Sequence, residues 1–316
     1  MMKLSINILV FTCLFSGFYS CETEFSHPDY KTRNIVIVVV DGARYSETWA
    51  DSGTANIVYM RDELSKLGCI CTNFYNNGPT YTLAGHVALT TGVYQEINNS
   101  GQEIPFFPSV FQYFDYKNKQ DSMVSYIISS KGKLQVLSNC QDAEWTQRFM
   151  PKTACGMNNE GVQSVSREDS LTFIEVIRIL NTCHSKLTLL SFREPDYSAH
   201  QGNWNNYLKG ISDTDKLIFR LWNFLQNDSV YKETTTLFVT NDHGRHLDTI
   251  ADGFISHGDG CEGCRHLFFF AAGPDFKNNE ILKNRHELID IPATVAELLQ
   301  IDLPHSNGTI MYDLFK

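Results

Sequence analysis

The chain has 316 residues, and its 26 Lys and Arg against 36 Asp and Glu give a formal net charge of −10. Hydrophobic residues make up 42% and charged residues 20%, which is typical of a chain with a large buried core and excludes disorder, collagen and coiled coil. An acidic chain lacks the basic surface that a binder of a nucleic-acid duplex needs. An anionic small molecule remains compatible with this charge if a local positive source, such as a metal ion, attracts it.

Residues 1–21 predict a signal peptide. Lys3 precedes a mostly apolar run that ends at Phe18 and is shorter than the roughly 20 residues of a membrane-spanning helix. Cys21 follows the small residue Ser20, an arrangement that resembles a bacterial lipoprotein signal. We therefore expect an exported protein, periplasmic or membrane-anchored. Either a lipidated Cys21 attaches it to a membrane, or a signal peptidase cleaves near Ser20.

The run from Asn34 to Val40 is the strongest strand signal, because continuous β-branched residues are typical of a strand buried on both faces. Further apolar strands are predicted at residues 124–129, 187–192, 235–240 and 267–272. Helical spacing lies between and after them, at Leu171, Ile174, Ile177 and Leu180, at Leu217, Leu221 and Leu225 behind a Ser212-Asp213 cap, and from Ile291 to Leu299.

This alternation predicts an α/β fold with a central, mostly parallel sheet and helices on both faces. Residues 22–316 are expected to form a single domain. Residues 93–165 are the least regular stretch, rich in Asn, Gly and Pro, and are expected to form an insertion or cap beside the site.

Carboxylates and imidazoles follow the predicted strands. Ligands gather beyond the carboxyl ends of parallel strands, so we expect these side chains to meet at one edge. They are Asp41, Asp196, His200, Asp242, His243 and, on the loop before the last strand, His257. One such residue is usually a cap or turn residue, but several from separate elements indicate metal. Carboxylate and imidazole ligands suit zinc, with manganese or iron as alternatives, and the lack of thiolates favours a catalytic site.

Thr82 ends the segment Gly78-Pro79-Thr80-Tyr81-Thr82, where a turn leads into a helix. Two interpretations remain open. Thr82 is either an ordinary N-cap or, beside two metals and the amide-rich start of the helix, an ionised nucleophile.

Seven cysteines follow the predicted signal and Cys21. Cys140 with Cys155, and Cys261 with Cys264, are the local candidates for disulfides in an oxidising compartment. The Cys261-Glu-Gly-Cys264 segment also fits half of a zinc site or a redox pair. Because the chain has no second such pair, the sequence favours a disulfide that staples the loop.

The motifs, taken in order, resemble the alkaline phosphatase superfamily, and most closely its nucleotide pyrophosphatase/phosphodiesterase branch. The resemblance covers residues 33–316 and rests on Asp41, Pro79-Thr80-Tyr81-Thr82 with His86 and Thr91-Gly92, Glu194-Pro195-Asp196 with His200, Asp242-His243-Gly244, and His257-Gly258. It implies an alkaline phosphatase-like catalytic domain over residues 22–316.

The resemblance also implies roles. Thr82 matches a nucleophile that forms a covalent phosphoryl intermediate. Two zinc ions are implied, one held by Asp196, His200 and His257, the other by Asp41, Asp242 and His243 together with the Thr82 oxygen. His86, His246 and His266 are candidates for supporting these ligands, although each is more typical of a hydrogen-bonded scaffold residue.

The chain departs from the branch at Ala84-Gly85, where relatives have Pro-Asn. Asn98 and Asn99 are both candidates for a phosphate-contacting asparagine, and we take Asn98 as the substrate-binding candidate. Lys131 and Lys133 resemble a Lys-x-Arg phosphate-binding element of some monoesterases, with solvated surface lysines as the alternative. If they reach the site, their charge favours a dianionic monoester over a diester. No cysteine lies in a sulfatase motif.

We therefore expect an exported two-metal hydrolase of phosphodiesters or pyrophosphates with a phospho-threonine intermediate. The alternative is a phosphomonoesterase or phosphonate hydrolase with the same site. A non-catalytic surface protein is disfavoured, because it predicts a lost ligand or nucleophile. The partner is a small phosphorylated molecule, while the leaving group and the oligomeric state are not readable from sequence.

Overall fold

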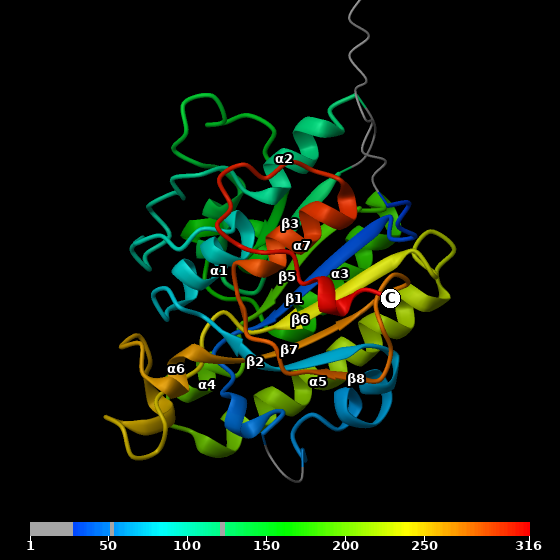
Figure 1. Ribbon diagram of the computed structural model, residues 1–316. Coiled ribbons are helices and arrows are strands. Elements are labelled where there is room, and N and C mark those ends of the chain that lie inside the picture. The colour runs from blue at the N-terminus through cyan, green and yellow to red at the C-terminus, as the bar shows by residue number, and fades with distance from the viewer. Residues whose placement is uncertain (1–27, 51–53, 121–123) are drawn as a thin grey trace, which may run out of the picture.

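The computed structural model describes residues 28–50, 54–120 and 124–316, so the predicted signal peptide and Cys21 lie outside the described residues. One mixed sheet forms the centre of the molecule (Figure 1). Its strand order is β4 (Lys152–Cys155), β3 (Ser125–Ser129), β5 (Leu187–Phe192), β1 (Asn34–Val40), β6 (Thr235–Thr240), β7 (His266–Ala272), β2 (Cys69–Tyr75) and β8 (Glu280–Leu282), with β9 (His286–Glu287) also paired to β2.

The five strands from β4 to β6 are all parallel, which confirms the predicted architecture. β7 is antiparallel to both of its neighbours, β6 and β2. The predicted bounds of β1, β5 and β6 agree with the structure, because their apolar runs are continuous and each is buried throughout. β2 was not predicted. Its burial is discontinuous and a register shift lies between Cys71 and Phe74, so no strand pattern stands out in the sequence.

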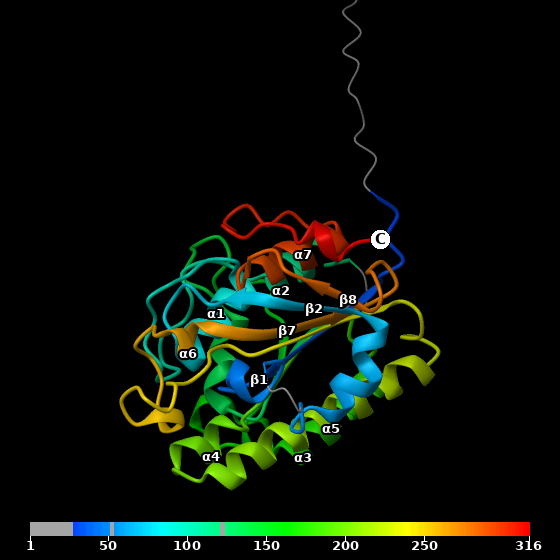
Figure 2. The ribbon, with the colours of Figure 1, turned by 60° about the horizontal axis from the view of Figure 1, so that its bottom comes forward.

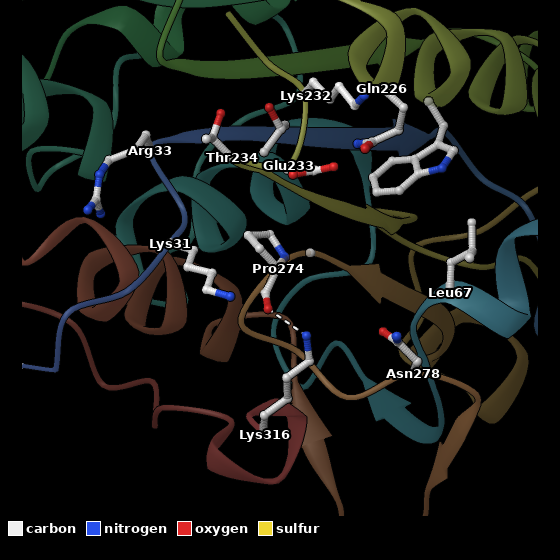
Figure 3. Close-up of a pocket in the computed structure, with 13 residues that line it drawn as sticks. Lys31, Arg33, Leu67, Gln226, Lys232, Glu233, Thr234, Pro274, Asn278 and Lys316 are labelled. Carbon is white, nitrogen blue, oxygen red and sulfur yellow. Dashed lines mark hydrogen bonds between the residues drawn. The ribbon is translucent and has the colours of Figure 1, made fainter.

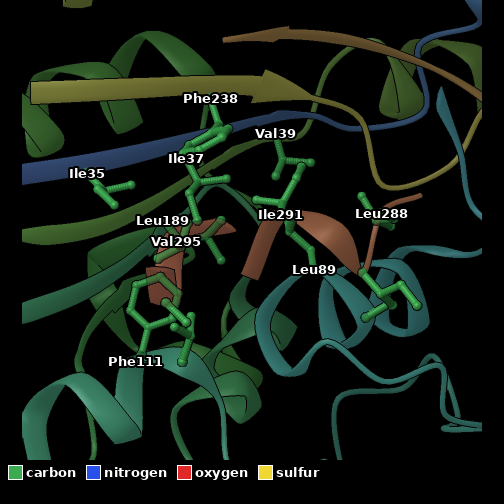
Figure 4. Close-up of a cluster of buried hydrophobic side chains, with 14 of the residues drawn as sticks. Ile35, Ile37, Val39, Leu89, Phe111, Leu189, Phe238, Leu288, Ile291 and Val295 are labelled. Carbon is green, nitrogen blue, oxygen red and sulfur yellow. The ribbon is translucent and has the colours of Figure 1, made fainter. Parts of the chain in front are cut away.

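Helices cover both faces of the sheet (Figure 2). Alternate side chains of β1 point to opposite faces of the sheet. Ile37 packs in one cluster with α1 (Thr82–Thr91), α2 (Val110–Lys117) and α7 (Asp290–Leu299). Val38 packs in the other with α3 (Asp169–Cys183) and α5 (Trp204–Asn227). Figure 4 shows Ile37, Leu189 and Phe238 on the side that faces Ile291 of α7.

Two helix predictions are corrected by the structure. α5 begins after Asn203, whose side chain accepts a hydrogen bond from the Asn206 amide, so Ser212 and Asp213 lie inside the helix and cap nothing. In α3, Leu171 and Ile174 are 44% and 63% exposed. A strict spacing of three drifts away from the 3.6-residue period, and the buried stripe is formed instead by Phe173, Val176, Ile179 and Leu180.

Residues 93–165 do not form a separate cap, because β3 and β4 are strands of the central sheet. A 3-10 helix, Gly132–Ser138, follows β3 and lies against α1. Among the described helices, none combines the length and hydropathy of a membrane span.

Gly85 sets the distance between α1 and the loop after β6. A Cβ atom at Gly85 would lie 2.4 Å from the backbone oxygen of Asp242, where no side chain fits without movement. This close approach explains the glycine at a position where the resembled family has a larger residue.

We predict that Gly85→Ala lowers the free energy of unfolding by about 1–3 kcal/mol, the usual cost of overpacking a buried contact. Chemical denaturation measures the change. Gly202→Ala is the control, because its Cβ would meet nothing closer than Ile255 at 3.7 Å and its φ of +67° adds only backbone strain. Unchanged stability of Gly85→Ala would contradict the close contact.

Candidate metal centre

The central strands of the sheet deliver the predicted ligands to one edge. Asp41 follows β1, Asp242 and His243 follow β6, and Asp196 opens α4 (Asp196–His200) after β5. Because β5, β1 and β6 are neighbours, these loops lie side by side, and the Asp196 amide donates to the Asp41 carbonyl at 3.1 Å. The structure thus brings the carboxylates together as the sequence predicted.

Asp41, Asp242 and His243 form one ligand group, with one donor atom of each within 4.8 Å of the others. All three side chains are fully buried. Asp41 Oδ1, one Asp242 oxygen and His243 Nε2 make no hydrogen bond, while Asp41 Oδ2 lies 2.7 Å from Lys131 Nζ. Buried carboxylates without donors are costly unless a cation compensates them. His243 Nδ1 lies 2.8 Å from the Gly244 carbonyl, which leaves Nε2 free to bind a metal.

Asp196 and His257 form a second group that shares His243 with the first, and the predicted ligand His200 adjoins it with a side chain that is 48% exposed. His200 Nε2 lies 3.2 Å from both Asp196 Oδ1 and His257 Nε2, and His257 Nε2 lies 3.5 Å from Asp196 Oδ1. Burial and the nearby His243 lower the pKa of His257 to about 2, so its imidazole is neutral, the form that binds metals. The rings of His243 and His257 stack at 3.8 Å, so the two groups adjoin.

Arg245 is a site residue that sequence reasoning missed. Its guanidinium is fully buried, donates to the Asp196 carboxylate and lies 3.3 Å from His200 Nδ1. It also donates to the backbone carbonyls of Phe254 and Ile255. Arg245 therefore orients the second group. The only sequence feature that could have indicated this role is the position of Arg245 two residues after His243.

Thr82 is the first residue of α1, and Tyr81 is the N-cap, so Thr82 does not cap the helix. The Thr82 hydroxyl lies 3.5 Å from Lys131 Nζ. Lys131 in turn contacts Asp41 Oδ2 at 2.7 Å and Asp196 Oδ2 at 2.6 Å. Although burial alone would raise the pKa of Asp41, the Lys131 charge lowers it to about 2. Lys131 is thus part of the site and not a solvated surface residue.

The asparagine next to the site is Asn99. Its Oδ1 accepts from the Leu83 amide at 3.0 Å, at the start of α1, and from Lys133 Nζ at 2.8 Å. Burial and the charge of Lys131 lower the pKa of Lys133 to about 8. Asn98 instead donates to Glu103 on an exposed loop. The choice between the two asparagines depended on the loop conformation, which no sequence pattern indicates.

The supporting residues are placed as follows. His86 is buried, with Nδ1 2.8 Å from the Thr82 carbonyl and 3.3 Å from Asp242, and so links the threonine to the first group. His266 stacks on Tyr45 and Tyr75, outside the centre. All seven cysteines of the described residues are free thiols, so the structure forms neither predicted disulfide.

A cavity of about 490 Å³ lies beside the loop of residues 77–81, which leads into α1. Its lining residues include Pro79, Tyr81, Tyr94, Glu96 and Gly258. A larger cavity of about 740 Å³ lies at the opposite edge of the sheet, before β1 and β6 (Figure 3). Its labelled residues, Lys31 and Thr234 among them, belong to none of the ligand groups. We therefore assign the chemistry to the edge that carries the ligands.

Comparison with known proteins identifies the family. The family model of the Metalloenzyme superfamily matches residues 34–303, so the chain belongs to this family. The fold is that of alkaline phosphatase-like hydrolases, which confirms the superfamily recognised from the sequence motifs.

Two solved structures share the fold. Phosphonate monoester hydrolase of Agrobacterium radiobacter superposes with a TM-score of 0.64 and 14% identity, over 89% of this chain and 77% of that one. Murine ectonucleotide pyrophosphatase/phosphodiesterase 5 superposes with 0.61 and 16%, over 90% and 100%. A 2,3-bisphosphoglycerate-independent phosphoglycerate mutase from Gracilaria tenuistipitata var. liui is 27% identical over 136 residues, which are 42% of this chain and only 25% of that protein.

We predict that Asp242→Asn loses roughly one of the metal equivalents bound by the wild-type chain, because an amide is a weaker ligand than a carboxylate. Metal analysis of the purified full chain measures this loss. Asp248→Asn is the matched control, since the Asp248 side chain is 78% exposed and belongs to neither group. Equal metal content in both variants would contradict the assignment of Asp242.

Proposed function

We propose that the chain is a metal-dependent hydrolase of phosphoric esters in which the Thr82 oxygen attacks phosphorus and forms a covalent phospho-threonine. One observation carries this proposal. The buried Thr82 hydroxyl opens α1 beside both ligand groups and within 3.5 Å of Lys131 Nζ. The murine structure supports it, because it is that of an inactive threonine-to-alanine variant in complex with AMP.

The donor sets fit two metal ions, with zinc favoured and manganese or iron as alternatives. Asp41, Asp242 and His243 would hold one, and Asp196, His200 and His257 the other. Bound metals would supply Lewis-acid stabilisation of phosphoryl oxygens and lower the pKa of an oxygen nucleophile.

The other residues of the chain have separate tasks. Facing Asp196 and Asp41 raises the pKa of Lys131, so this lysine is a fixed positive charge and not a base. It lies where it can offset charge on a phosphoryl oxygen next to Thr82. Asn99 ties Lys133 to the Leu83 amide and so holds a second cation close to the start of α1.

These two lysines favour a phosphomonoester as substrate. A terminal phosphate carries two negative charges and gains more from a buried ammonium group than a diester with one charge does. The position of Lys131 therefore supports the monoester alternative over the diester that the sequence resemblance suggested. Phosphonate monoesters and diesters remain the second class, in line with the two solved neighbours.

The leaving group would occupy the cavity of about 490 Å³ beside Tyr81 and Tyr94. Its lining residues include Gln95, Glu96 and Arg265, so a polar leaving group fits better than an apolar one. Export by residues 1–21, with or without lipidation of Cys21, is part of the proposal and rests on the sequence alone.

We predict that Thr82→Ala lowers kcat for p-nitrophenyl phosphate by at least ~10³-fold while the bound metal is retained, since the nucleophile is lost but the carboxylate and imidazole ligands stay. Steady-state kinetics and metal analysis on one sample measure both quantities. Thr82→Ser is the control and is expected to keep part of the activity, because it keeps a hydroxyl. Full activity of Thr82→Ala with metal bound would refute the covalent route.

We predict that Lys131→Ala lowers kcat/KM for p-nitrophenyl phosphate by ~10–100-fold and affects bis-p-nitrophenyl phosphate less, because the lost ammonium serves the second charge of the monoester. The ratio of the two rates is the measurement. Lys117→Ala is the control, since Lys117 donates to backbone carbonyls at the end of α7, on the surface. An unchanged ratio, or a wild type that prefers the diester, would restore the diester as the substrate.

A further inference from the structure

A third cluster of metal-binding side chains lies outside the candidate centre. His246, Asp259, Cys261 and Cys264 each place one donor atom within 4.8 Å of the others. They lie on the long connection between β6 and β7, around the short helix α6 (Glu262–Arg265), seen in gold in Figures 1 and 2. None of them belongs to the two ligand groups described above.

His246 is oriented as a ligand. Its side chain is buried, with the residue 6% exposed, and its Nε2 makes no hydrogen bond although Asp259 Oδ1 is 3.2 Å away. The other ring nitrogen, Nδ1, lies 3.2 Å from Ser256 Oγ and 3.3 Å from Asp252 Oδ1. A carboxylate on one nitrogen fixes the ring and presents the other nitrogen to a metal.

The spacing of the four donors suits a small tetrahedral ion. Zn–S bonds of about 2.3 Å and Zn–N bonds of about 2.0–2.1 Å put neighbouring ligand atoms roughly 3.3–3.8 Å apart. The donor atoms of the cluster all lie within 4.8 Å of one another, and His246 Nε2 and Asp259 Oδ1 are 3.2 Å apart. Two thiolates, one imidazole and one carboxylate are a donor set that favours zinc over magnesium or calcium.

We propose that His246, Asp259, Cys261 and Cys264 bind a structural zinc ion. Four protein ligands close the coordination shell and leave no position for a substrate. The sequence argued against zinc here because it contains no second Cys-x-x-Cys pair. The structure supplies the missing two ligands from outside the motif, as a histidine and an aspartate. A Cys261–Cys264 disulfide is the competing arrangement, and both cysteines are free in the structure.

The ion would fasten together the two segments that carry catalytic-centre residues. His246 is three residues after His243 and next to Arg245, and Asp259 is two residues after His257. Backbone hydrogen bonds already join these segments, from the Gly244 amide to Cys264 and from the Arg245 amide to Gly263. The four ligands act on the centre through His257 and Arg245 and are positioning residues.

Cobalt substitution of the full-length protein tests the proposal without any variant. Among the three clusters in the described part of the chain, this one alone contains cysteines, so Co²⁺ bound here gives a near-ultraviolet sulfur-to-cobalt charge-transfer band, which the oxygen and nitrogen ligands of the catalytic centre cannot give. We predict this band in the wild type. We also predict that Cys261→Ser with Cys264→Ser abolishes it and lowers the zinc content by about one equivalent per chain.

Cys183→Ser is the matched control, because Cys183 is also partly exposed but lies beside Tyr126, and it is expected to keep the band and the metal. Asp242→Asn and Thr82→Ala are expected to keep the band while metal content or activity falls, which separates this site from the proposed function. No thiolate band in the wild type, or an intact-mass measurement that shows a Cys261–Cys264 disulfide, would overturn the proposal.

Discussion

The structure depends on one electrostatic constraint, the burial of several carboxylates at a single edge of the sheet. Asp41, Asp196 and Asp242 are all less than 4% exposed. Lys131 Nζ contacts one Asp41 oxygen at 2.7 Å, and the other makes no hydrogen bond. Positive charge must therefore be supplied locally, and the chain itself supplies part of it through Lys131 and Arg245. The net charge of −10 consequently says little about the centre, where cations and anions are concentrated together.

The order of the strands arranges this charge in space. β3, β5, β1 and β6 are consecutive neighbours, and the residues after them are Lys131, Asp196, Asp41 and Asp242. Lys131 contacts both Asp196 and Asp41, and the hydroxyl of Thr82 at the start of α1 lies 3.5 Å from its Nζ. A substrate phosphate would therefore meet a lysine on one side and metal-binding carboxylates on the other, so the two sides of the site differ in charge.

Much of this arrangement was predictable from the sequence, because several of the ligands directly follow continuous β-branched apolar runs, which are typical of buried strands. Asp41 after β1 and Asp242 after β6 are examples, and the strand bounds agree. The lateral order of the strands was not predictable, so neither was the contact of Lys131 with Asp41. The roles of Asn99 and Arg245 were not predicted either, because they depend on loop conformations that hydrophobic periodicity does not encode. The exposure of Leu171 and Ile174 in α3 shows that residue spacing alone does not identify the buried face, even within one helix.

The antiparallel direction of β7 gives the connection of residues 241–265 an unusual freedom. Since β6 ends and β7 begins at the same edge, this connection leaves the sheet and returns to it without crossing either face. Insertions or deletions inside it would leave the register of both strands unchanged, unlike those in a crossover between parallel strands. Divergence among relatives can therefore concentrate in the part of this connection between His246 and His257, and with it the shape of the rim around the centre, while the sheet that carries Asp41 stays the same.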